Sequence, residues 1–117
     1  ENAQQIVQSV IDSGKKFNVI YAENDDMAKG AAAALDKAGI SHGVGKDVII
    51  MGFDCNKWAL EELLAKRWNY DGQCNPFQAS YIDDIIKNGA KQKTVIMVEK
   101  GFDAATITKA DVAKYGI

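Results

Sequence analysis

The sequence predicts an α/β fold built on a parallel β-sheet. Short runs of apolar, β-branched and aromatic residues alternate with segments whose apolar residues recur at helical spacing. Two of the runs, residues 17–22 and 48–53, are apolar at nearly every position, which is typical of strands that are covered on both faces. The alternation of such strands with helices favours a parallel sheet with helices on both faces.

The expected elements follow one another in a regular order. The expected strands are residues 17–22, 48–53, 70–74 and 94–98. The expected helices are residues 2–13, 25–38, 57–66 and 77–88, with a short helical turn in 107–117. Asn24 or Asp25 is expected to cap the second helix, Gly14 and Gly39 to end the first two, and Pro76 to open the fourth. The apolar residues of the fourth helix are expected to face inward: Phe77, Tyr81, Ile82, Ile85 and Ile86.

Composition and charge exclude several classes of function. A chain of 117 residues with 47% hydrophobic and 26% charged residues is ordinary for one globular domain. A formal net charge of −2 provides no basic surface for nucleic acid. The longest apolar run is far shorter than a membrane span, and the first residues lack a signal-peptide pattern.

Polar side chains follow three of the expected strands, at the ends where open α/β sheets bind ligands. Asn24 lies two residues beyond the first strand, Asp54 follows the second, and Gln73 and Cys74 end the third. A carboxylate accepts two hydroxyl hydrogen bonds and an amide both donates and accepts, so this set suits vicinal hydroxyl groups. Because a hydrogen bond to a charged group contributes roughly 1.5–3 kcal/mol, Asp54 is expected to be the strongest anchor.

The polar cluster has a plainer interpretation, which stays open beside the first. Asp25 and Asp26 suit the cap and dipole of a helix N-terminus, and Asp54 could be an ordinary turn residue. Glu23 could lie at the rim of a cleft or contact a hinge. The sequence shows no nucleophile paired with a base, no Gly-rich phosphate loop and no metal cluster, so we expect neither enzymatic activity nor a cofactor.

The remaining chemically distinctive residues are isolated. His42 is expected in a solvated turn, and Trp58 and Trp68 in the core or at a rim rather than on a ligand. The histidine and the two cysteines, Cys55 and Cys74, are not spaced as a zinc site. Sequence leaves open whether the cysteines form a disulfide.

Four stretches occur in a specific order: VIYAENDDMAKGAAAALDKAG, GKDVIIMGFD, CNP and ITKADVAKYG. Together they resemble the C-terminal half of type I periplasmic sugar-binding proteins, the ABC-transporter components of the ribose/galactose/galactofuranose group. The combination of N-D-x-M-A-x-G-A with a later G-F-D is specific to this family, whereas either motif alone would be weak evidence for it. The resemblance covers almost the whole chain and implies a Rossmann-like lobe.

The resemblance implies roles for individual residues. Asn24 and Asp54 would hydrogen-bond sugar hydroxyl groups. The third polar contact of the family falls at Cys74, where a thiol replaces the amide of the family. Gln73 and Asn75 are alternatives for this contact, although strand alternation aims them differently from Cys74.

The resemblance also implies a larger, two-lobed protein that closes on a monosaccharide. Residues 1–117 would supply its C-terminal lobe, and the partners would be the missing N-terminal lobe and a membrane permease. The implied location is periplasmic or extracellular, with a lipid anchor as an option in the full-length protein. Residues 77–98 normally belong to the other lobe, so their apolar face is expected to repack, to stay mobile or to pair with a second copy. Of these, we expect self-association.

The stretch AKRWNYDG departs from the family, which usually has a glycine at the end of the third helix. Arg67 and Trp68 are expected to reshape the cleft rim here.

Two other functions are consistent with parts of the pattern. The effector domain of a LacI-type repressor has the same lobes, with a DNA-binding headpiece outside this chain, but CNP favours the transporter component. A phosphoacceptor receiver domain would bind Mg²⁺ through Asp25 and Asp26 and carry the phosphoryl group on Asp54. Receivers, however, place a further strand between those two positions.

Overall fold

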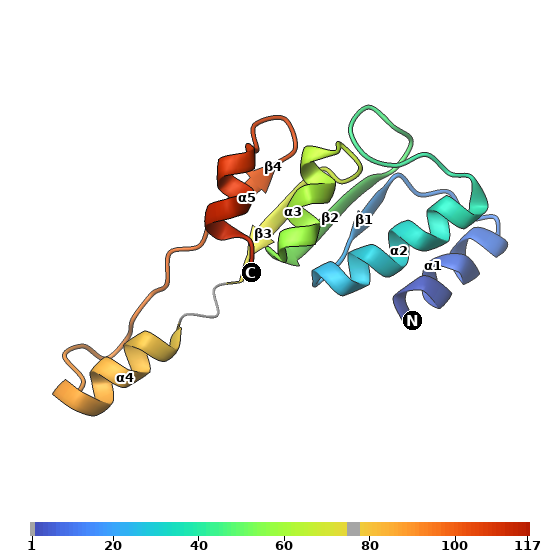
Figure 1. Ribbon diagram of the computed structural model, residues 1–117. Helices are drawn as coiled ribbons and strands as arrows, with labels where there is room; N and C mark the ends of the chain where they lie inside the picture. Colours follow the sequence, from blue (N-terminus) through green and yellow to red (C-terminus); the bar gives the residue numbers. More distant parts are fainter. Residues whose placement is uncertain (1, 75–77) are drawn as a thin grey trace.

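The computed structural model describes residues 2–74 and 78–117, which form a four-stranded sheet and five helices (Figure 1). The strands are β1 (Val19–Tyr21), β2 (Ile49–Asp54), β3 (Tyr70–Gln73) and β4 (Gly101–Asp103). The helices are α1 (Asn2–Asp12), α2 (Asp25–Ala38), α3 (Lys57–Leu64), α4 (Gln78–Asn88) and α5 (Lys109–Tyr115). In the described part of the chain, no helix has the length and apolar character that crossing a membrane requires.

The sheet has the strand order β1-β2-β3-β4. The pairs β1–β2 and β2–β3 are parallel, with Val19 opposite Ile49 and Met51 opposite Tyr70, so the predicted α/β class and parallel sheet are confirmed. β4 pairs with β3 in the antiparallel direction. The sequence analysis missed β4 because a three-residue strand is too short to show a period.

A single core lies between one face of the sheet and the helices. Ile50 and Phe102 point from the sheet into this core, and α2, α3 and α5 contribute its buried residues. Trp68 is 1% exposed, so it belongs to the core and not to a rim. α1 packs against α2 and adds Val7 and Ile11 at the margin.

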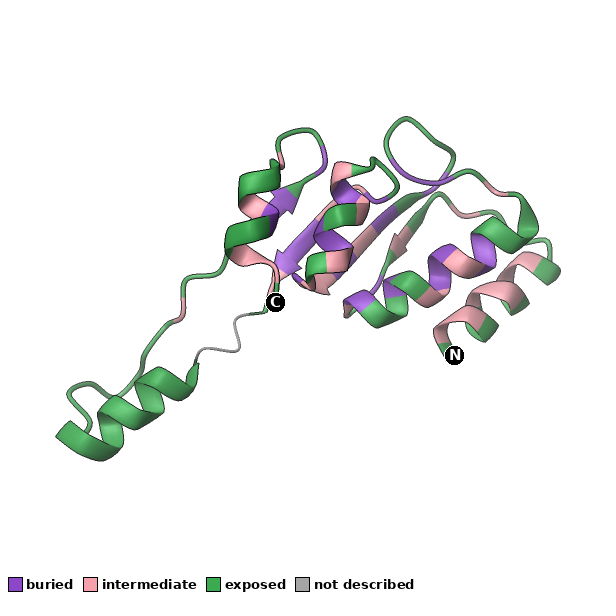
Figure 2. Cartoon of the chain, viewed as in Figure 1, coloured by how far each residue is buried: buried purple, intermediate pink, exposed green. Residues whose placement is uncertain are grey.

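The opposite face of the sheet is open in the described residues. Val19, Tyr21 and Ile49 are 47%, 64% and 40% exposed, although the sequence predicts β1 and β2 to be covered on both sides. The rings of Phe53 and Tyr70 lie on the same face, and Phe53 contacts Tyr21 with a centroid distance of 5.2 Å. In the described residues, the helices that pack on the sheet lie on one of its faces (Figure 2). The other face keeps exposed apolar residues.

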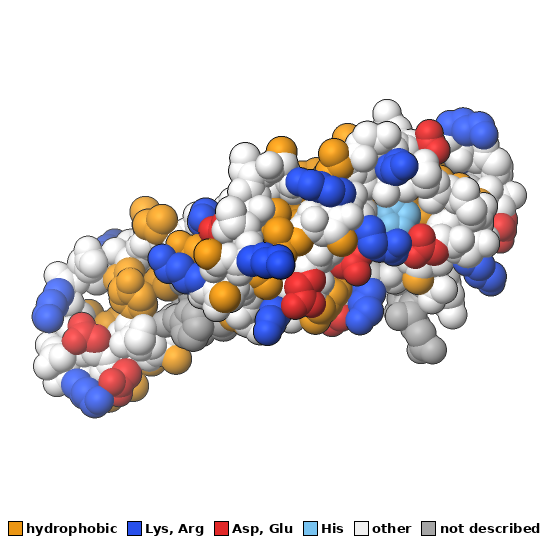
Figure 3. All heavy atoms as spheres, turned by 45° about the horizontal axis from the view of Figure 1, so that its top comes forward, with side chains coloured by type: hydrophobic (Ala, Val, Ile, Leu, Met, Phe, Trp, Pro, Cys, Tyr) orange, Lys and Arg blue, Asp and Glu red, His pale blue; other side chains and the backbone are white. Residues whose placement is uncertain are grey.

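The segment that contains α4 projects away from the rest of the molecule (Figure 1). Its large apolar residues were predicted to point inward, but Tyr81, Ile82, Ile85 and Ile86 are all exposed, and hydrophobic atoms gather on this projection in Figure 3. Residues 94–98 were predicted to form a strand, but they are extended without strand pairing. They lie away from the sheet, on the side of α4, so no strand of the described residues is beside them to pair with. Phe77 and Pro76 lie outside the described residues.

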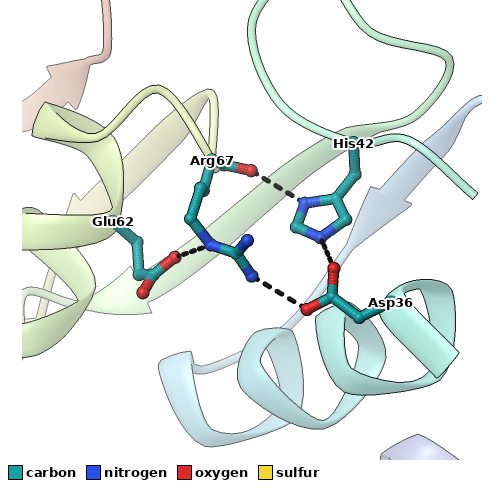
Figure 4. A network of polar contacts seen from close by, with 4 residues as sticks. All are labelled: Asp36, His42, Glu62 and Arg67. Atoms are coloured by element: carbon teal, nitrogen blue, oxygen red, sulfur yellow. Dashed lines mark hydrogen bonds and ion pairs between the residues drawn. The ribbon is translucent and has the colours of Figure 1, made fainter. Parts of the chain in front are cut away.

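A polar network closes the amino-terminal edge of the sheet (Figure 4). His42 is 8% exposed, not solvated as expected; Nδ1 lies 2.9 Å from the carbonyl oxygen of Arg67 and Nε2 lies 3.0 Å from Oδ1 of Asp36. The Arg67 guanidinium donates to Asp36 at 2.9 Å and to Glu62 at 2.7 Å. Partial burial raises the pKa of Asp36, but the hydrogen bonds from Arg67 and His42 outweigh it, so this pKa lies below its usual range.

This network corrects the placement of Arg67. Its loop leads into the first residue of β3, and His42 precedes β2, so both lie at the end of the sheet opposite the carboxyl ends of the strands. Neither Arg67 nor the buried Trp68 lies at the predicted cleft rim. The network instead ties α2 to α3 at the base of the lobe.

Candidate functional site

The carboxyl ends of β1, β2 and β3 meet at one edge of the sheet. The parallel register places Asp54 directly opposite Gln73, and Asn24 follows β1 at the same end. Three of the residues that the sequence analysis singled out are therefore brought to one edge. That they bind a ligand remains a prediction.

Asn24 is the N-cap of α2. Its backbone is extended and its Oδ1 accepts a hydrogen bond from the backbone N–H of Met27 at 2.8 Å. The cap therefore falls on Asn24 and not on Asp25. The cap uses one lone pair of Oδ1, so Asn24 can donate to a ligand through Nδ2 while the cap is kept.

The sequence analysis named Asn24 or Asp25 as the cap and gave Asp25 a role at the helix N-terminus; Asp25 lies in the first turn of α2, but it does not cap the helix. Its side chain is 0% exposed, and Oδ2 accepts hydrogen bonds from Asn56, from the backbone N at 2.9 Å and from Nδ2 at 3.2 Å. Asp25 thus ties the start of α2 to the turn that follows β2. A receiver domain would need Asp25 and Asp26 to face a metal together, but Asp25 is buried while Asp26 is exposed.

Asp54 occupies a strained turn between β2 and α3. Its φ is 131° and that of the next residue, Cys55, is 64°, both in the region that favours glycine. Such conformations persist when the surrounding structure enforces them, and they cluster at functional sites. The hydrogen bonds from Asn56 to Asp25 provide such a constraint immediately after the strained pair.

Asp71 in β3 is a second buried carboxyl that the sequence analysis missed. It is 0% exposed, and in the sheet it pairs with Gly52, where a Cβ atom would lie 2.5 Å from Oδ1 of Asp25. Glycine at position 52 leaves the room that the Asp25 carboxyl occupies. The available signal was an acidic residue at a strand position that faces the helices.

The two buried carboxyl groups have strongly perturbed ionisation. Burial and then the negative charge of Asp25 raise the pKa of Asp71 to about 8. Burial also raises the pKa of Asp25 to about 6, although the hydrogen bonds from Asn56 work in the opposite direction. Both effects penalise the charged form of a carboxyl group that is removed from water.

The other predicted contacts lie beside this edge. Gln73 is half-buried and its Oε1 accepts from the backbone N of Lys100 at 3.3 Å, which leaves its amide nitrogen for other partners. Cys74 and Glu23 are exposed. Cys55 is buried, and neither it nor Cys74 is in a disulfide. Asn75 lies outside the described residues.

The edge does not form an enclosed site by itself. The cavity beside Asn24, of about 380 Å³, is open, and it lies between the start of α1 and the start of α2. Its lining residues are Asn2, Ala3, Asn24, Asp26 and Met27, and do not include Asp54. Within the described residues, no group of three or more His, Cys, Asp or Glu side chains could hold a metal ion.

Comparison with known proteins places the chain in a family. A family model described as a periplasmic binding protein domain matches residues 1–82, which is more than half of the chain. The chain belongs to this family. The resemblance to type I periplasmic sugar-binding proteins is thereby confirmed.

Relatives of this periplasmic binding protein domain include a curated protein from Bifidobacterium longum, Fructose import binding protein FruE. It is 32% identical over 116 residues, which are 94% of this chain and 34% of the relative. A shorter match, 42% identical over 48 residues, joins 41% of this chain to 14% of the HTH-type transcriptional regulator AscG from Escherichia coli.

Solved structures show the same fold. A Mycobacterium smegmatis protein in complex with β-D-fucofuranose has a TM-score of 0.74 and 28% identity, over 88% of this chain and 34% of that chain. A galactofuranose binding protein has a TM-score of 0.82 at 24% identity, over 97% of this chain and 40% of that chain. Most of this chain is matched in these comparisons, but it spans only about a third of the length of the matched proteins.

Proposed function

We propose that the chain is the C-terminal, carbohydrate-binding lobe of an ABC-transporter solute-binding protein. The observation that carries the proposal is the meeting of Asn24 and Asp54 at one edge of a periplasmic binding protein domain. The role is non-catalytic capture of a monosaccharide for uptake. A relative named as a fructose import binding protein supports this role.

The geometry suggests a division of labour among the polar groups. The Asp54 carboxylate accepts hydrogen bonds from sugar hydroxyl groups, while Asn24 donates through Nδ2 and its oxygen still caps α2. Gln73 lies opposite Asp54 and offers its amide nitrogen. The exposed Cys74 and Glu23 lie farther out, as rim contacts.

The remainder of the binding site comes from a second lobe in the full-length protein. Its closure over the open edge provides most of the affinity, so the 117-residue chain alone binds sugar weakly or not at all. Residues 77–98 belong to that other lobe, and the projection of α4 away from the sheet supports this assignment. The full-length protein delivers its sugar to a membrane permease from a periplasmic or extracellular position, free or lipid-anchored.

A panel of monosaccharides tests the proposal in the full-length protein. We expect at least one sugar to raise its melting temperature in a saturable manner, since a ligand that binds only the folded state stabilises it. The isolated chain should show no such rise at the same sugar concentrations. Absence of any shift in the full-length protein would contradict the proposal, and micromolar affinity of the isolated chain would contradict the role of the second lobe.

The match to AscG favours the effector domain of a LacI-type repressor as a second candidate. Both candidates would bind a small ligand at the same edge. They differ in the segment that precedes this lobe in the full-length protein, which is a helix-turn-helix headpiece in a repressor. A gel-shift assay in which the full-length protein retards DNA in a sugar-dependent manner would favour the repressor.

We expect the isolated chain to self-associate through the segment 77–98. Ile82 and Ile86, 56% and 76% exposed, lie on α4, which projects away from the sheet, and an apolar sheet face is open in the described residues as well. Sedimentation velocity should show dimers or larger species whose fraction rises with concentration. Ile86→Glu should shift the distribution toward monomer, whereas Ser80→Glu, the same charge on the opposite face of α4, should not. A strictly monomeric chain at high concentration would refute this expectation.

A further inference from the structure

The carboxyl groups of Asp25 and Asp71 face each other without a donor between them. Oδ1 of Asp25 and both oxygens of Asp71 are buried, and none of the three accepts a well-formed hydrogen bond from the described residues. The outer oxygen of Asp25, Oδ2, is different because it accepts both hydrogen bonds from Asn56. Three acceptor atoms therefore meet in a place that water does not reach.

Two ionised carboxyl groups in such contact are unfavourable, because each loses its hydration and each repels the other. One proton removes the conflict. A protonated Asp71 has an O–H donor, and the inner oxygen of Asp25, Oδ1, can accept from it, which pairs two of the three buried oxygens. Asp25 then stays ionised and keeps the charge that strengthens its hydrogen bonds from Asn56.

We propose that Asp25 and Asp71 share one proton and act as positioning residues for the turn that carries Asp54. The turn is anchored only two residues beyond Asp54, where the N–H and side-chain amide of Asn56 bind Asp25. The φ angles of 131° and 64° at Asp54 and Cys55 need such an anchor. The shared proton does not depend on the proposed function, whereas an effect on sugar binding does.

The charged groups around the pair favour retention of the proton, whereas the hydrogen bonds from Asn56 and from the backbone of Cys55 oppose it in part. Asp54, at the end of β2, adds a third negative charge that raises the pKa of both carboxyl groups. The Cys55 thiol is buried in the same place, and its pKa is raised above its usual range by burial and by the negative charges of Asp71, Asp25, Asp54 and Glu99. The backbone of Cys55 opposes the effect on Asp71 only in part.

The sign of the pH dependence follows from the raised pKa of Asp71. The folded protein retains a proton that the unfolded chain releases near pH 4. The stability that this proton contributes is therefore fully present below pH 4 and is lost as the pH rises toward about 8. Where the difference is one full proton, the unfolding equilibrium constant rises by about tenfold per pH unit. Asp36 and Asp111 have lowered pKa values and act in the opposite direction, but only in acid.

Urea unfolding between pH 5.5 and 8.5 tests the shared proton. We expect the wild-type protein to become less stable across this range and Asp71→Asn to lose most of the slope, because an asparagine amide donates to Asp25 without titrating. Asp71→Leu, which leaves a single buried carboxyl group, is a second variant with the same expectation. Asp26→Asn removes an exposed neighbouring carboxyl and should keep the wild-type slope. Groups elsewhere in the protein are the same in all variants, so the comparison isolates the pair.

The positioning role is tested by the amide signals of Asn56 in ¹⁵N-resolved NMR spectra over the same pH range. In the wild type, the backbone and side-chain signals of Asn56 should shift as the folded protein loses the shared proton, near pH 8, where the loss of stability levels off, and in Asp71→Asn they should not. An equal slope in wild type and Asp71→Asn would overturn the shared proton. If the pH slope of stability is lost in Asp71→Asn but the Asn56 signals of the wild type do not move with pH, the positioning role would be overturned. Both readouts work without sugar, so failure of the sugar panel would leave them interpretable.

Discussion

Replacement of Asp54 by asparagine in the full-length binding protein is expected to weaken sugar binding by about 10- to 100-fold. The substitution removes the charged acceptor at the edge of the sheet, and a hydrogen bond to a charged group contributes about 1.5–3 kcal/mol. Asparagine also tolerates a positive φ better than most residues, so the strained turn at φ 131° should be retained. Isothermal titration calorimetry with the sugar that the panel identifies measures the change.

The matched control for this variant is Asp26→Asn. Asp26 lies two residues beyond Asn24 at the start of α2, and it is exposed. The control makes the same chemical change near the same edge, and the sugar dissociation constant should stay within about twofold of the wild-type value, a few tenths of a kcal/mol. Equal losses of affinity in the two variants would mean that general electrostatics, and not a contact with Asp54, controls binding.

Replacement of Trp68 by alanine is expected to lower the free energy of unfolding by about 3–5 kcal/mol, because truncation of a buried Trp leaves a large cavity. Trp68 is 1% exposed and lies over Gly52, where a Cβ atom would come within 3.0 Å of its ring. Such a loss is comparable to the whole stability of a small domain. Urea unfolding followed by circular dichroism measures it.

Trp58 provides the comparison within the same aromatic pair. The two rings meet edge to face at a centroid distance of 5.8 Å, but Trp58 is only half-buried. Trp58→Ala should therefore cost clearly less than Trp68→Ala. If the two variants were equally destabilised, the position of Trp68 at the centre of the core would be wrong.

Features that local chemistry determines could be predicted from the sequence. Runs of apolar residues identified β1 and β2, and the helix between them was predicted from its cap and from Gly39, which ends it in the left-handed conformation. The meeting of Asn24, Asp54 and Gln73 at one edge followed because parallel strands align their carboxyl ends. These inferences need no knowledge of contacts that are distant in the sequence.

The missed features depend on such distant contacts. Asp25 looked like a capping residue because its partner, Asn56, lies 31 positions away. His42 looked like an ordinary turn residue because its burial depends on Asp36 and on the carbonyl group of Arg67. Residues of α4 read as core because they are amphipathic, and a periodic pattern does not say which surface will cover it.

A crystal structure of the full-length protein with its sugar tests the central claim most directly. We predict that the Asp54 carboxylate lies within hydrogen-bond distance of one or two sugar hydroxyl groups. Asn24 should donate from Nδ2 while its Oδ1 still caps α2. A sugar bound without contact to either residue, with Asp54 serving only the turn after β2, would contradict the account.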